Sequence, residues 1–246
     1  MSKLNAGVLI IGDEILSGRT QDTNSHFIAK NLIESGINLE EIKIIQDDKN
    51  LIKESVLDFY KKYNYVFTTG GIGPTHDDIT SKSIAKAFEV SYGYHKEAYE
   101  ILKKYYKSGE FNEGRKKMAK IPETATLIYN PSSGAPGFIV ENVFCLPGVP
   151  SILKSMLGGL KNEISGGNPI ISHTINLRTV ESEIAKPLKE VQENNIDVEI
   201  GSYPFFKSDK VGVAIVLRSE DESKISICKK QSCMNHYSAL ATALPQ

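Results

Sequence analysis

The 246-residue sequence has no long apolar run and almost no net charge, and each absence removes a class of protein. No stretch approaches the roughly 18 apolar residues of a membrane span, and the apolar residues 6–11 are too few for a signal peptide. Lys and Arg total 29 against 30 Asp and Glu, so the chain lacks the positive field of a duplex nucleic-acid binder. We therefore expect a soluble, cytoplasmic protein with neither a membrane nor a nucleic-acid partner.

Cysteine is also scarce: Cys145, Cys228 and Cys233 are the only three, and they lack zinc-type spacing. A chain of this length buries roughly 70 to 75% of its unfolded surface, so folding requires neither a disulfide nor a structural metal. No glycine is followed by Lys-Ser or Lys-Thr, which excludes a P-loop. The cysteines are therefore expected to be reduced thiols packed in a core.

Strand and helix patterns alternate through the first part of the chain. Short apolar, β-branched runs at residues 6–11, 41–45 and 65–69 indicate strands, and each is followed by apolar residues at helical spacing. This order predicts an α/β fold with a doubly wound parallel sheet, in which ligands bind beyond the carboxyl ends of the strands. We expect Asp77 or Asp78 to cap the helix that follows the third strand.

A linker rich in glycine, at residues 165–169, divides the chain. It separates a larger α/β domain, residues 1–166, from a smaller α+β domain, residues 170–246. The smaller domain has the order strand, helix, strand, strand, helix. We find no internal repeat in either part.

A pair of acidic side chains follows each of the three predicted strands. In chain order the pairs are Asp13 and Glu14, Asp47 and Asp48, and Asp77 and Asp78. Because the carboxyl ends of parallel strands share one edge of the sheet, we expect these carboxylates to converge. Acidic residues are also common in such loops and as helix N-caps, so a purely structural role remains open for each one taken alone.

Glycines dominate the turn after the third strand, where Thr69 is followed by Gly70, Gly71 and Gly73. Glycines allow backbone N–H groups to approach an anion, and a helix start adds partial positive charge. His76 stands where a dinucleotide-binding G-x-G-x-x-G motif would need its third glycine. An anion cradle among carboxylates repels phosphate unless a divalent cation lies between them, so the combination points to a metal-assisted phosphate or pyrophosphate site.

Several segments carry a family resemblance. They are GDEILSG at residues 12–18, TTGGIGPTHDDIT at residues 68–80, and residues 22–24, 130–138, 146–150, 181–182 and 201–204. They resemble the molybdopterin-binding domain of molybdenum-cofactor biosynthesis, and most of all the N-terminal part of the competence/damage-inducible protein A family with its small KH-like domain. The resemblance implies a small-molecule nucleotide or pterin ligand and a homo-oligomer, either a dimer or a trimer.

The resemblance also implies an activity. The two aspartates that the family needs for nucleotide chemistry correspond to Asp47 and Asp78. The implied enzyme is a hydrolase that depends on a divalent metal, Mg²⁺, Mn²⁺ or Co²⁺, and cleaves the pyrophosphate bond of a nucleotide such as ADP-ribose or FAD. Long family members carry an amidohydrolase domain that this sequence does not contain, so we expect no deamidase activity.

This hypothesis gives each candidate residue a role. Asp47 and Asp78 are catalytic and hold the metal, together with Glu14 and Asp77. The expected phosphate- and substrate-binding residues are Gly12, Ser17, Asn24, Thr69, Gly70, Gly71, Gly73, Ser133 and Gly134. The tract 132–137 is expected to close over the nucleotide.

Two basic groups have open roles. His76 is either a general acid/base, because its ordinary pKa lies near neutrality, or a loop histidine that only forms hydrogen bonds, and we favour the second. Arg115 either reaches a second phosphate or belongs to a solvated basic turn, which we also favour.

Three other functions compete with the hydrolase. One is a binding module that holds a pterin or nucleotide without turnover, and another is a molybdopterin adenylyltransferase. A KH-like domain also raises nucleic-acid binding. Residues 170–246 contain only Gly201 and Gly212, so the G-x-x-G loop that such binding uses is missing and we discount it.

Overall fold

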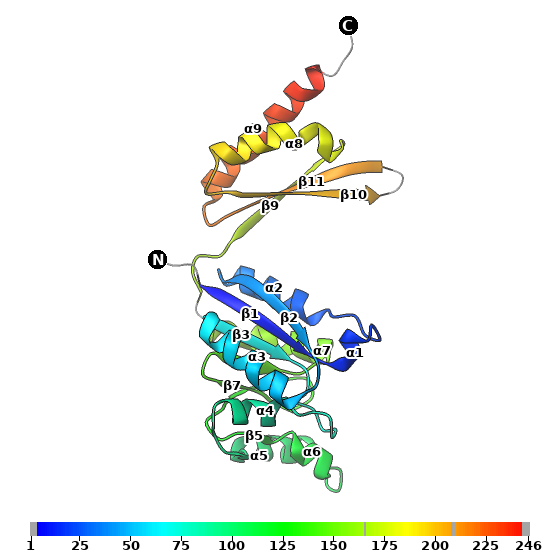
Figure 1. Cartoon of the computed structure of the whole chain (residues 1–246), viewed down its shortest axis with the longest axis vertical. Helices are drawn as coiled ribbons and strands as arrows, with labels where there is room; N and C mark the ends of the chain where they lie inside the picture. The colour runs from blue at the N-terminus through cyan, green and yellow to red at the C-terminus, as the bar shows by residue number, and fades with distance from the viewer. Residues whose placement is uncertain (1–3, 165, 208–209, 243–246) are drawn as a thin grey trace. The chain divides into compact units, whose positions relative to one another are not determined.

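The computed structural model describes residues 4–164, 166–207 and 210–242. The chain divides between Gly167 and Asn168 into two compact units (Figure 1). Each unit has its own buried apolar core. Within the described residues, no helix has both the length and the apolarity needed to cross a bilayer.

A six-stranded sheet forms the centre of the first unit, in the order β2-β1-β3-β8-β7-β6. Its strands are β1 (Asn5–Ile11), β2 (Asn38–Ile45), β3 (Tyr65–Thr69), β6 (Thr126–Ile128), β7 (Gly137–Val140) and β8 (Val143–Leu146). Strands β2, β1, β3 and β8 are parallel, whereas β7 runs antiparallel to both of its neighbours. The predicted α/β fold is confirmed, with a mainly parallel sheet. The exception arises because only two residues connect β7 to β8, and so short a link permits only an antiparallel pair.

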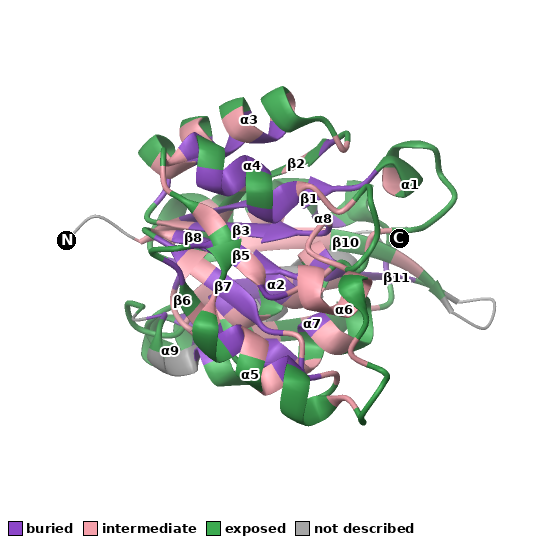
Figure 2. Cartoon of the chain, turned by 90° about the horizontal axis from the view of Figure 1, so that it is seen from below, coloured by how far each residue is buried: buried purple, intermediate pink, exposed green. Residues whose placement is uncertain are grey.

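Helices cover both faces of this sheet (Figure 2). They are α2 (Asn24–Glu34) and α7 (Pro150–Leu157) on one face, and α3 (Lys49–Lys62) and α4 (Thr80–Ala87) on the other. The strand β1 shows why both faces are needed. Its side chains alternate, so Val8 and Ile10 pack with α2 and α7 while Leu9 and Ile11 pack with α3 and α4. A strand that is apolar on both sides is stable only between two layers of helix.

Smaller elements complete the first unit. They are α1 (Asp13–Leu16), β4 (Tyr92–Tyr94), α5 (Lys96–Tyr105), α6 (Glu113–Lys117), β5 (Lys120–Pro122) and the 3₁₀ helix η1 (Gly158–Asn162). Strands β4 and β5 form a two-stranded antiparallel ribbon. We call residues 92–122 the appended segment. It has a small core of its own around Ala98, Leu102 and Ala119.

The second unit is an α+β domain built on a three-stranded antiparallel sheet in the order β10-β11-β9. Its elements are β9 (Ile171–Leu177), α8 (Glu181–Asn194), β10 (Glu199–Lys207), β11 (Lys210–Ser219) and α9 (Glu222–Thr242). The helices contribute Ile184 and Ile225 to a core that they share with β11. Cys228 is buried in this core and Cys145 in that of the first unit, both as free thiols, whereas the side chain of Cys233 lies outside the described residues.

Candidate functional site

A pocket of about 470 Å³ lies beside the ends of β3 and β8. Its lining comes from the loop after β3, the loop after β8, Glu14 after β1, and parts of the tract 130–136. This is the edge where ligands of parallel sheets bind. The pocket contains six of the predicted site residues, which are Glu14, Gly70, Gly71, Gly73, Asp78 and Ser133.

The glycine turn after β3 has a backbone that only glycine adopts without strain. Gly70 and Gly71 have φ angles of +106° and +67°. A Cβ atom on Gly70 would lie 2.0 Å from the carbonyl oxygen of Ile11. The Gly70 N–H donates to the carbonyl of Leu146 at 3.2 Å, so this turn ties together the ends of β1, β3 and β8. Gly70, Gly71 and Gly73 all belong to the pocket lining, so the backbone of the turn forms part of the pocket wall.

Asp78 closes the second half of this loop. Its Oδ2 accepts hydrogen bonds from the Thr75 backbone N–H, at 2.7 Å, and from the Thr75 hydroxyl. Because the carboxylate is turned back to Thr75, it does not cap α4, which begins at Thr80 with Ile79 as its N-cap. The prediction that Asp77 or Asp78 caps this helix is therefore wrong. Both of these bonds go to Oδ2 and none is formed by Oδ1, which remains available to a ligand.

Asp47 lies behind the glycine turn and outside the pocket lining. Its Oδ2 accepts a hydrogen bond from the Asp13 N–H at 3.1 Å, and its Oδ1 lies 3.5 Å from the position of a Cβ on Gly71. Burial raises the pKa of Asp47, and the nearby carboxylates of Asp13, Glu14 and Asp77 raise it further. The acidic residues after the three strands therefore influence one another, as the parallel sheet predicts.

These carboxylates do not form a complete metal cage. Among the residues that the structure describes, no three His, Cys, Asp or Glu side chains are grouped closely enough to hold an ion. Mg²⁺ is usually bound by one or two carboxylates, with water and substrate phosphate oxygens as its other ligands. Glu14 and Asp78 on the pocket wall, with Asp47 behind them, fit that kind of site.

Replacing Asp47 by Asn is expected to raise the melting temperature at pH 7 by a few degrees at most. The raised pKa means that the ionised carboxylate destabilises the folded state above the ordinary Asp pKa of 3.8. The amide keeps an acceptor for the Asp13 N–H, and partial solvent exposure keeps the effect small. Thermal melts from pH 3 to pH 8 will show whether the gain disappears as the pH falls below 3.8, where Asp47 becomes neutral in both the folded and the unfolded chain.

Asp48 offers a matched control for this measurement. Its carboxylate caps α3, accepting from the N–H groups of Asn50 and Leu51 at 2.9 Å each. Asp48→Asn keeps the cap but removes a negative charge that favours a helix N-terminus, so its melting temperature should fall slightly. A fall for Asp47→Asn as well would contradict the assigned effect of burial.

Asn24 and Thr69 act from within the core. The Asn24 amide donates to the Thr69 hydroxyl and to the Gly148 carbonyl, at 2.8 Å each, and the Thr69 hydroxyl donates to the Pro147 carbonyl at 3.0 Å. Both side chains are buried and neither lines the pocket. They fix the loop after β8, whose residues Pro147 and Gly148 are part of the pocket wall.

The remaining predicted residues lie around the pocket rather than in its lining. Ser17 is exposed and donates to the Glu14 carbonyl at 3.3 Å. A Cβ on Gly12 would lie 2.7 Å from the Glu14 carboxylate, and one on Gly134 would lie 2.6 Å from the ring of Tyr105. Asp77 is exposed beside His76, whose ring is almost wholly in solvent.

Asn130 is a site residue that the sequence interpretation did not single out. It is buried, and its Oδ1 accepts from the N–H groups of Ser132 and Ser133 at 2.9 and 3.1 Å. Its Nδ2 donates to the Ser133 hydroxyl at 2.7 Å and to the Ala135 carbonyl at 2.8 Å. One side chain therefore fixes the whole tract that forms this wall. The motif at residues 130–138 contains Asn130, but it served only to support the family resemblance.

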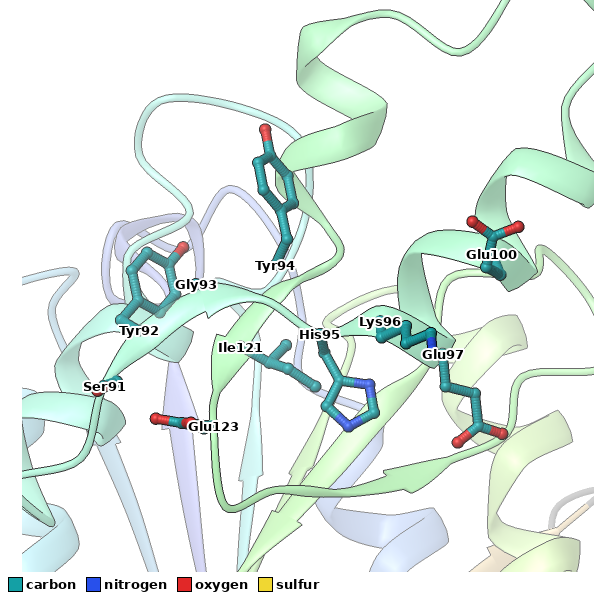
Figure 3. Close-up of a pocket in the computed structure, with 10 residues that line it drawn as sticks. All are labelled: Ser91, Tyr92, Gly93, Tyr94, His95, Lys96, Glu97, Glu100, Ile121 and Glu123. Carbon is teal, nitrogen blue, oxygen red and sulfur yellow. The ribbon is translucent and has the colours of Figure 1, made fainter.

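A larger cavity, of about 610 Å³, lies on the appended segment (Figure 3). Tyr92, Tyr94 and His95 line it together with Glu97 and other carboxylates. None of these is a predicted site residue, and no strand of the main sheet ends there. The His95 ring already accepts a hydrogen bond from the Ala98 N–H at 3.3 Å as the N-cap of α5. The smaller pocket, where the strand ends, glycine turn and carboxylates meet, is therefore the candidate site.

Comparison with known proteins identifies the family of this chain. Residues 7–165 match the family model described as "Probable molybdopterin binding domain", and residues 169–238 match the one described as "FAD synthase, middle domain". The crystal structure of the protein CinA, of unknown function, from Thermoplasma acidophilum aligns with a TM-score of 0.62 at 32% identity, covering 66% of this chain and 99% of that one.

Three curated relatives cover most of this chain. A protein of Archaeoglobus fulgidus is 36% identical over 91% of this chain and 94% of its own length. A probable FAD synthase of Caenorhabditis elegans is 31% identical over 87% of this chain but only 46% of its own length. A putative competence-damage inducible protein of Clostridium tetani is 30% identical over 90% of this chain and 56% of its own. The chain thus belongs to the family of proteins with a molybdopterin-binding domain, as the motifs at its strand ends predict.

Proposed function

We propose that this chain is a divalent-metal-dependent hydrolase that cleaves the pyrophosphate bond of a nucleotide such as ADP-ribose or FAD. The observation that carries the proposal is the meeting of a glycine turn and two carboxylates, Glu14 and Asp78, on one pocket wall. The turn offers backbone N–H groups to phosphate oxygens, and the carboxylates offer ligands to a cation. Relatives named as FAD synthases support a substrate of the nucleotide class.

The proposal gives the residues of the pocket wall different roles. In this proposal the backbone N–H groups of Gly71 and Gly73 hold the diphosphate, and Gly70, whose own N–H donates to Leu146, shapes the turn. Asp78 and Glu14 would hold the cation. A divalent cation bound there would neutralise phosphate charge and favour attack by water on phosphorus. Asp47 adds negative charge behind the turn. Burial raises its pKa, and a cation bound nearby would favour its ionised form.

A binding module without turnover is the second candidate. Part of the pocket wall is apolar, with Met118, Pro136 and Ile152, and such a wall suits a flat ring. A pterin or nucleotide held there without hydrolysis would need the wall and the glycine turn but not the carboxylates. A molybdopterin adenylyltransferase would use the same wall with a second nucleotide.

The test is a turnover assay with ADP-ribose, FAD and NAD, each with Mg²⁺, Mn²⁺, Co²⁺ or EDTA. The hydrolase is expected to release AMP from at least one of them with a metal and from none with EDTA. Thermal stabilisation by a nucleotide without release of AMP under any condition would leave the binding module. Adenylylation of molybdopterin in place of hydrolysis would favour the adenylyltransferase.

A further inference from the structure

Three consecutive basic residues end the helix α6, and each has a different partner. Arg115 lies 3.5 Å from the Glu110 carboxylate and stacks on the Tyr106 ring, with its guanidinium carbon 4.1 Å from the ring centroid. Lys116 pairs with Glu113 at 2.6 Å. Lys117 instead donates to the backbone carbonyls of Thr75 and Asp78, the latter at 2.9 Å.

Lys117 therefore contacts the loop that carries Asp78, about forty residues away in sequence. Its two carbonyl acceptors lie at either end of the short turn that the Asp78 carboxylate closes. The backbone of α6 also approaches this loop, since a Cβ on Gly114 would lie 3.5 Å from the Pro74 carbonyl. The next residue, Met118, lines the pocket, whereas Lys117 itself lies outside the lining. The end of α6 thus forms part of the boundary of the site.

Lys117 has no direct ion-pair partner, although the exposed carboxylate of Asp77 lies near enough to interact with its charge. Within the described part of the chain, it has no carboxylate oxygen within 4.0 Å, unlike its two basic neighbours. Carbonyl oxygens satisfy hydrogen bonds but leave the net positive charge in place, and an ammonium has a third N–H to donate. The charged side chains in the pocket lining itself, Glu14 and Asp78, are both negative.

We propose that Lys117 is the phosphate-binding cation of the pocket and that its ligand is a nucleotide with a diphosphate group. Its ammonium contacts a phosphate oxygen with its free N–H. Its bonds to the two carbonyls hold the Asp78 loop beside that phosphate. A lysine whose ammonium is hydrogen-bonded only to backbone carbonyls keeps its positive charge and one N–H donor for an anionic ligand. This inference rests on the pocket of the proposed function and names the residue that recognises the phosphate.

The test is calorimetric titration of the full chain with ADP at several salt concentrations, with Mg²⁺ and again with EDTA. Lys117→Met is expected to weaken ADP binding about tenfold or more, because it removes a charge-assisted hydrogen bond. Its affinity should also depend less on salt than that of the unchanged protein. Lys117→Arg should restore most of both properties, and Lys116→Met, whose cation faces Glu113, should alter neither.

A purely structural role gives a different result. If Lys117 only supports the loop, Lys117→Met will lower the melting temperature without ligand and leave the salt dependence of ADP binding unchanged. Either that result, or ADP binding equal to that of the unchanged protein, overturns the proposal, as does a failure of the unchanged protein to bind ADP. Because binding is measured without turnover, Lys117-dependent binding without AMP release would refute the hydrolase alone.

Discussion

Asp78→Asn is expected to reduce pyrophosphate hydrolysis by about a hundredfold or more. The negative charge of Asp78 holds the cation, and the cation in turn neutralises the diphosphate. The amide oxygen still accepts the hydrogen bond that the Thr75 N–H donates to Asp78, so the loop keeps its closure. The loss should therefore appear in kcat, with little change in melting temperature. Steady-state assays with the substrate and metal that give the highest turnover will measure it.

Thr75→Val is the matched control for this variant. It removes the hydroxyl that donates to Asp78 but leaves the carboxylate and the Thr75 N–H in place. One lost hydrogen bond at an exposed position should change the rate by less than about tenfold. Equal losses in the two variants would mean that Asp78 serves only to shape the loop, and the hydrolytic mechanism would then need another carboxylate.

Gly70→Ala is expected to destabilise the first unit by about 3 kcal/mol or more and to remove nucleotide binding. The new Cβ would meet the Ile11 carbonyl oxygen at 2.0 Å, and the φ angle of +106° is strained for any residue with a Cβ. Relief requires the ends of β1 and β3 to separate, and this displaces the glycine turn from the pocket. Chemical denaturation and ADP titration of the same preparation will measure both effects.

Gly18→Ala is the control that measures backbone strain without the steric clash expected at Gly70. Gly18 also has a positive φ angle, of +72°, but a Cβ there meets nothing within 4 Å. Its cost should be about 1 to 2 kcal/mol, the penalty of the left-handed conformation alone. If the two variants lose the same stability, then the contact between Gly70 and the end of β1 is not what restricts this position.

The layered fold could be predicted because its signals are local. Residues 6–11 alternate between two buried faces, and such a run has no other stable place than between layers of helix. The start of β2 was missed because an edge strand tolerates the exposed polar side chains of residues 38–41. The direction of β7 was also missed, since it depends on a two-residue connection rather than on the composition of the strand.

Site residues that lie in the loop after a strand could be predicted from the sequence. Side chains that fix a loop far away in the sequence could not. Glycines at positions 70, 71 and 73 come at or soon after the end of β3, and the acid at 78 lies in the same loop before α4, so the sheet brings them to one edge. The bonds of Asn24 to Gly148 and of Lys117 to Asp78 join residues far apart in the chain. Spacing in the sequence carries no information about such contacts, and a resemblance assigns a residue to a motif without telling which atoms it touches.

The loops around the pocket are each fastened by a side chain of the protein itself. Asn130 holds the tract 130–136, Asn24 holds the loop after β8, and Asp78 and Lys117 hold the turn between them. A ligand therefore meets walls that are already in position, and little conformational entropy is lost when it binds. Discrimination among nucleotides then comes from how well each ring fits a nearly fixed shape. A change of substrate preference would require new side chains on these walls rather than a new motion of the chain.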